Sequence, residues 1–139
     1  MISISELQNI ATSEKEAEDK AAEAKLLRDL ATYREQLKEV HPEFIKYIQD
    51  QIIIAMKRNQ KRAELYSYGV EKIFAAMKKP LHSEVLYYIA DETRRAGRAL
   101  DIAMKEEAEI IRKELLKAGV KGFKKGGGYL GDPTIYVLF

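Results

Sequence analysis

The sequence contains no cysteine and no tryptophan among its 139 residues. Without cysteine there are no disulfides, no thiolate metal sites and no cysteine nucleophiles, and the redox compartment stays undetermined. No apolar run approaches the roughly 20 residues that cross a bilayer, and the N-terminus has no basic region of the signal-peptide kind. We therefore expect no membrane partner and a cytoplasmic location, which would be host cytoplasm or virion if the protein is viral.

The sequence also lacks an excess of charge of either sign. It has 24 Lys and Arg against 22 Asp and Glu, for a net charge of +2. This balance argues against a dedicated polyanion binder of the histone kind, and equally against an acidic mimic of DNA. The length suits a single shared core.

Proline and glycine are sparse, so their positions are informative. The three prolines are Pro42, Pro80 and Pro133, and six of the eight glycines follow Ala118. Proline breaks a helix interior but is tolerated in a first turn, so the prolines predict element boundaries. We expect helices over residues 3–40, 42–79 and 83–118, the last capped by Gly119. The domain prediction is a helical bundle in residues 1–118, with a glycine-rich connector and β element in residues 119–139.

Apolar periodicity supports three helical segments. Ser3 and Glu6 have capping-box spacing, and a heptad seam follows from Leu26 to Val40, whereas the stretch before it offers mainly alanine. The first half of this helix should therefore be weakly anchored. The short connection near residue 80 predicts an antiparallel hairpin of the next two segments. The predicted fold class is mainly α: a long antiparallel helical hairpin plus an N-terminal helix, bundle- or coiled-coil-like, with a short C-terminal β element.

The C-terminal residues are strongly β-prone. Alternation along residues 134–139 leaves both faces of the strand largely apolar. Residues 120–125 are a candidate hairpin partner for one edge, and we expect the other edge to be open to another subunit. The predicted interaction strand comprises Ile135, Tyr136, Val137, Leu138 and Phe139.

Enzyme signatures are missing from the sequence. His41 and His82 are the only histidines, and the predicted hairpin places them at opposite ends. The glycine run at residues 126–128 lacks the pattern of a phosphate-binding loop, and Glu106, Glu107 and Glu109 are explained by pairing on a solvated helix face. We predict no enzyme, no catalytic residue, no metal site and no cofactor.

A cluster of basic residues is the main candidate binding site. The predicted hairpin brings two groups of arginines together near its middle, close to a tyrosine. This band could hold phosphates or stacked bases, could bind an acidic protein, or could be a solvated face neutralised by nearby acids. The tentative anion-binding or nucleic-acid-binding residues are Arg58, Arg62, Arg94, Arg95, Arg98 and Tyr66.

Tyrosine is abundant, with eight residues, and the consecutive residues Tyr87, Tyr88 and Ile89 cannot all face one core stripe. Either the core is broad or a second contact face exists. Together these features predict a non-enzymatic assembly or protein-interaction subunit, homo-oligomeric, acting by helix packing and C-terminal strand addition. Size and simplicity suit a viral or phage structural or accessory protein. The alternative is a small protein that binds nucleic acid or anionic nucleotides through the arginine band.

Overall fold

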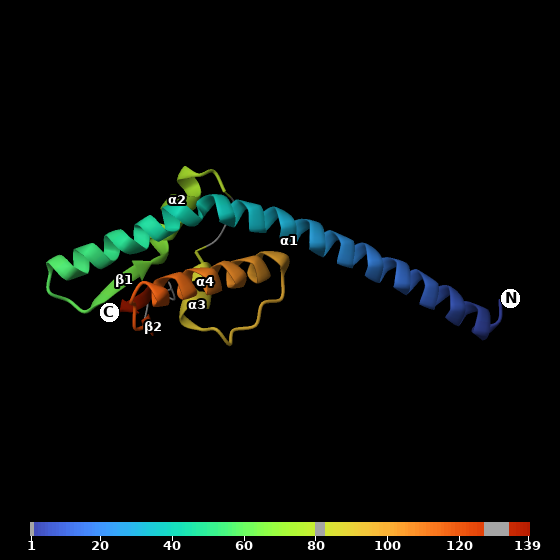
Figure 1. The fold of residues 1–139 in the computed structure, drawn as a ribbon. Helices are drawn as coiled ribbons and strands as arrows, with labels where there is room; N and C mark the ends of the chain where they lie inside the picture. Colours follow the sequence, from blue (N-terminus) through green and yellow to red (C-terminus); the bar gives the residue numbers. More distant parts are fainter. Residues whose placement is uncertain (1, 80–82, 127–133) are drawn as a thin grey trace.

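The fold is mainly helical with a small C-terminal sheet, which confirms the predicted class. The computed structural model describes residues 2–79, 83–126 and 134–139. Helix α1 spans Ile4–Lys57 and is followed by strand β1, Arg62–Tyr66, and helix α2, Ser67–Ala76. Helices α3, Val85–Ala90, and α4, Ala99–Lys117, precede strands β2, Gly122–Gly126, and β3, Thr134–Leu138. Figure 1 shows α1 as a long rod against which the other elements gather at one end.

Helix α1 starts as predicted and runs further than predicted. The side chains of Ser3 and Glu6 form the expected capping box. The boundary expected at Pro42 is wrong, because the helix continues through this residue to Lys57. Proline removes one backbone donor and costs about 3 kcal/mol in a helix interior. The buried residues Val40 and Phe44 on either side pack into the core and offset this cost, and α1 bends near its middle (Figure 1).

The expected helix over residues 42–79 is also interrupted after Lys57. Asn59 adopts a positive φ of 56°, which ends α1 and turns the chain back. The next residues then form β1, in which Ala63 and Leu65 are buried and Arg62 and Tyr66 are exposed. This alternation is what a strand with one face on the core requires.

The expected helix over residues 83–118 is divided into α3 and α4. Between them Asp91 is extended, and its carboxylate accepts hydrogen bonds from the Thr93 backbone and hydroxyl. Ser83, the first residue of the expected range, does not cap α3, and its hydroxyl donates to Glu71 instead. Gly119, with φ of 111°, follows the end of α4 as predicted.

Helices α1 and α4 lie side by side and run in the same direction. Arg34 pairs with Glu106, and about two turns further along each helix His41 pairs with Glu114. This parallel contact replaces the antiparallel pairing expected between residues 42–79 and 83–118. The expected chain reversal at residues 80–81 and His82 lie outside the described residues.

The three strands form an antiparallel sheet in the order β1-β3-β2. The predicted partner of the C-terminal strand is confirmed, since Gly122 pairs with Leu138 and Gly126 with Thr134. The expectation that the other edge stays open is wrong, because β1 pairs along it from Arg62–Leu138 to Tyr66–Thr134. The C-terminal strand is therefore the middle strand of the sheet.

One core joins the sheet to the helices. Ile135 and Val137 of β3 are fully buried on the sheet's inner face, beside Leu65 of β1. Helix residues with no more than 2% exposure complete this core: Val40, Phe44, Ile48, Val70, Phe74, Val85, Leu86, Ile89, Ala103, Met104, Ala108 and Ile111. Burial of this apolar surface is the main driving force for folding.

Candidate interaction surface

The N-terminal half of α1 is not buried against any other part of the described chain. Every residue from 2 to 28 is exposed, and the first buried residue of the helix is Leu30. Figure 1 shows this half extending away from the other elements. We call residues 4–28 of α1 the arm. At 1.5 Å per residue it is about 37 Å long.

Local propensity explains why the arm is helical. Its middle consists almost entirely of Ala, Glu and Lys, which are good helix formers, and pairs such as Glu16 with Lys20 have favourable i, i+4 spacing. Isolated helices in water are nevertheless marginal, because most helix stability in proteins comes from packing an apolar face. The arm has no such packing within the chain.

The arm carries aliphatic side chains that nothing in the described chain covers. Ile4, Leu7 and Ile10 are 66%, 44% and 46% exposed, and Leu26 and Leu27 are also exposed. Ile4, Leu7 and Ala11 recur at i, i+3 and i+7, so they share one helix face. Exposed aliphatic residues gathered on one face are typical of interaction sites.

The arginines predicted to form one band lie on separate elements. Arg58 and Arg62 flank the turn between α1 and β1, whereas Arg94, Arg95 and Arg98 lie in the segment before α4. Figure 1 shows the turn after α1 and the segment before α4 at well-separated places. The predicted mid-helix band depended on a continuous hairpin, and the strand β1 and the break before α4 remove that geometry.

Several of these side chains have partners within the chain. The Arg62 guanidinium lies 4.4 Å from the centre of the Tyr136 ring, and that of Arg94 lies 4.4 Å from the Tyr87 ring. Arg98 Nε lies 3.0 Å from Asp101 Oδ2. These are ordinary cation–π and surface ion-pair contacts.

Tyr66, the aromatic member of the predicted set, also has a local partner. Its hydroxyl donates to Glu64, and this hydrogen bond raises the pKa of Tyr66 to about 12. Arg58 and Arg95 are exposed. The structure thus brings Arg62 and Tyr66 onto one face of β1 but does not gather the six predicted residues into one site.

The outer edge of the sheet next to α1 is covered by side chains of that helix. The Tyr47 hydroxyl accepts from the Tyr66 backbone N–H at 2.9 Å, and Gln51 Nε2 donates to the Glu64 carbonyl at 3.0 Å. Gly69 of α2 leaves room for the Tyr47 ring, which an added Cβ would meet at 2.5 Å. Covering an edge in this way protects it from pairing with other chains.

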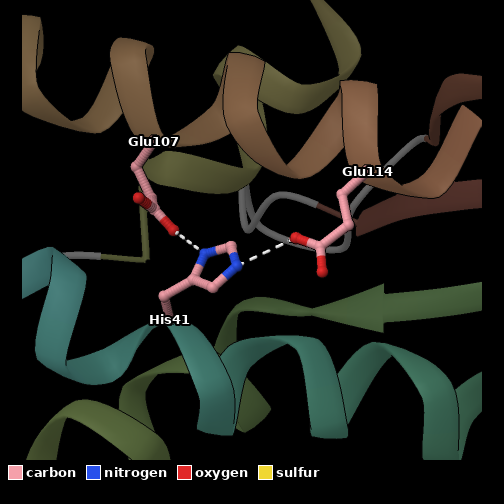
Figure 2. Close-up of polar contacts among 3 residues, drawn as sticks. All are labelled: His41, Glu107 and Glu114. Carbon is pink, nitrogen blue, oxygen red and sulfur yellow. Dashed lines mark hydrogen bonds and ion pairs between the residues drawn. The ribbon is translucent and has the colours of Figure 1, made fainter. Parts of the chain in front are cut away.

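Sequence reasoning missed a histidine clamped between two carboxylates. His41 Nε2 lies 2.9 Å from Glu114 Oε2, and its Nδ1 contacts Glu107 Oε1 (Figure 2). Burial disfavours the charged imidazole, but the two carboxylates outweigh it, so the pKa of His41 is raised. The pKa of Glu107 is raised as well, because burial of the charged carboxylate raises it more than the hydrogen bond and charge of His41 lower it.

A groove of about 450 Å³ adjoins this histidine, between α1 and α4. Leu37, Pro42 and Ile110 give it apolar walls, and Arg34 and Glu106, which form an ion pair, also line it. Among the described residues lining it, none carries a hydroxyl or thiol nucleophile.

The expected pairing of Glu106 and Glu107 within a solvated face of α4 is wrong, since both pair with α1. The one sequence signal was the spacing of Glu107 and Glu114, seven residues apart on one helix face.

Replacing His41 with glutamine should lower the free energy of unfolding by about 2 kcal/mol near pH 6, because two charge-assisted hydrogen bonds are lost. Folding raises the pKa of His41, so its contribution is fully present below about pH 6.5, the ordinary value. The contribution should vanish as the pH rises through the folded-state pKa. Urea unfolding of the wild type and His41→Gln at several pH values measures this difference. A difference that is constant with pH would contradict it, and Glu43→Gln at an exposed position is the control.

In the described ranges, no helix is both long and apolar enough to cross a membrane, and no group of three or more His, Cys, Asp or Glu side chains is arranged to hold a metal. The sequence matches no known protein-family model, no curated protein and no solved structure.

Proposed function

We propose that the protein is a non-enzymatic assembly subunit that self-associates through its arm. The observation that carries this proposal is the complete exposure of the arm, residues 4–28, whose exposed side chains include five large aliphatic ones. A partner helix or surface that covers those side chains would supply the packing that the arm lacks.

Helix packing is the part of the sequence-based hypothesis that this proposal keeps. Strand addition at the C-terminus is not included, because β1 and β2 occupy both edges of β3. Nucleic-acid binding by an arginine band is not the proposed function either, since the arginines in question are divided between two elements.

The experiment replaces one exposed isoleucine of the arm with serine and measures mass by light scattering. The wild type should exceed the monomer mass of 15.9 kDa at micromolar concentration. Ile10→Ser should raise the dissociation constant about 10- to 100-fold, since burying an isoleucine contributes about 1.5–3 kcal/mol. The matched control is Ile110→Ser on α4, because Ile110 is 53% exposed and Ile10 46%. Equal masses for wild type, Ile10→Ser and the control would contradict the proposal.

A further inference from the structure

The arm is acidic, and the remainder of the chain is basic. The arm contains six acidic side chains and four basic ones, for a balance of −2. The rest of the sequence then holds 20 basic and 16 acidic residues, for a balance of +4. Glu14 and Glu18 lie on the same helix face as Leu7 and Ala11, so the negative charge borders the exposed aliphatic residues.

The basic charge gathers at the other end of the molecule. Helices α1 and α4 both finish there, and backbone hydrogen bonds from Phe139 to Lys61 and from Lys121 to Leu138 hold the following segments together. We call this surface the basic end, and its exposed cationic residues are Lys57, Arg58, Lys61, Arg62, Lys117 and Lys121. In the part of the chain that the structure describes, none of these six forms an ion pair.

The basic end also exposes apolar side chains. Ile53, Ile54 and Met56 in the last turns of α1 are 49%, 43% and 55% exposed. A hollow of about 440 Å³ next to Met56 is lined by Met56, Lys61, Lys121 and Phe139, among others. This surface therefore has the composition that complements the arm: aliphatic side chains surrounded by charge of the opposite sign.

From this match, and resting on the function proposed above, we infer that the partner of the arm is the basic end of a second copy. Figure 1 shows the start of α1 and its end at opposite extremes of an elongated molecule, so the arm cannot reach the basic end of its own chain. Contacts between two different surfaces are heterologous, and they build rings or open chains rather than a closed two-fold dimer. Assembled mass should therefore keep rising with concentration beyond that of a dimer, unless a ring closes.

Charge reversal on each surface tests this contact. The arm variant carries Glu14→Lys and Glu18→Lys, and the end variant carries Arg58→Glu and Lys61→Glu. Each should self-associate at least tenfold more weakly than the wild type, because like charges then face each other. An equimolar mixture should recover association, since each variant then offers the other a complementary surface. Salt should weaken wild-type assembly, because surface charges are screened.

The control matches the end variant, because it also replaces two basic residues with glutamate, but at positions on α1 outside both surfaces. Lys38→Glu with Lys46→Glu alters two exposed lysines outside both surfaces and should leave assembled mass unchanged. If the end variant assembles like the wild type while Ile10→Ser does not, head-to-tail contact is refuted and assembly through the arm stands. If Ile10→Ser has no effect, the proposed function itself fails.

A nucleic-acid partner at the basic end is the competing outcome. Binding of a fluorescein-labelled 20-nucleotide single-stranded DNA at low salt reports on it. If the end variant loses DNA binding but keeps its assembled mass, the basic end serves an anionic polymer and the inference is overturned. Loss of assembled mass in the end variant with recovery in the mixture supports the inference.

Discussion

Replacing Val137 with proline should unfold the sheet and lower the free energy of unfolding by about 3 kcal/mol or more. The hydrogen bond from Phe139 N–H to Lys61 shows that alternate residues of β3, Val137 among them, direct their N–H groups toward β1. Proline removes that donor from a middle strand, and its ring would enter a position with no exposure. Urea unfolding followed by circular dichroism measures the loss.

The control for this substitution is Leu138→Thr. Leu138 is half-buried on the opposite face of the same strand, and threonine keeps the backbone N–H, so the substitution should cost only about 1 kcal/mol, roughly half of what a fully buried leucine contributes. If Val137→Pro instead keeps the wild-type stability and only reduces assembled mass, then β3 pairs with another chain rather than with β1.

Replacing Phe74 with alanine should lower the free energy of unfolding by about 3–5 kcal/mol. Phe74 is 1% exposed in α2, and its ring centre lies 6.5 Å from that of Phe44 in α1. The substitution leaves a cavity where α2 packs on the bend of α1. Thermal or urea unfolding measures the effect, and Tyr68→Ala at a 66% exposed position of the same helix is the control. Equal stability of the two variants would show that α2 does not pack there.

Local signals in the sequence predicted those parts of the fold that depend on neighbouring residues. Ser3 and Glu6 marked the start of α1, and Gly119 marked the end of α4. The alanine-rich start predicted weak anchoring of residues before Leu26, and those residues are exposed. Capping and glycine conformations need only a few residues, so a single sequence reveals them.

The strand β1 could not be predicted in the same way. Its sequence, Arg-Ala-Glu-Leu-Tyr, contains helix formers, and only pairing with β3 makes it a strand. Strand preference depends strongly on such tertiary context. Pro42 misled for a related reason, because the core residues around it outweigh the cost of proline in a helix.

The carboxylates around His41 could not be predicted from the sequence, because they lie far from it along the chain. Glu107 lies 66 residues and Glu114 73 residues from the histidine, and the contact requires α1 and α4 to be parallel neighbours. The arginine band depended on a hairpin register that β1 interrupts, so the structure does not bring its residues together in the way that the sequence predicted. The sequence shows where the aliphatic residues of the arm lie, but only the structure shows that the arm is unpacked and that these residues are exposed.

Amide hydrogen exchange of residues 4–28 at two protein concentrations tests most directly whether the arm is covered by another copy. At high concentration the amides of the arm should be protected, because packing against the partner stabilises the helix. On dilution below the dissociation constant they should exchange quickly, while those of Phe44 and Ile48 in the core stay protected. Exchange in the arm that is fast at both concentrations, or equally protected at both, would contradict self-assembly through this helix.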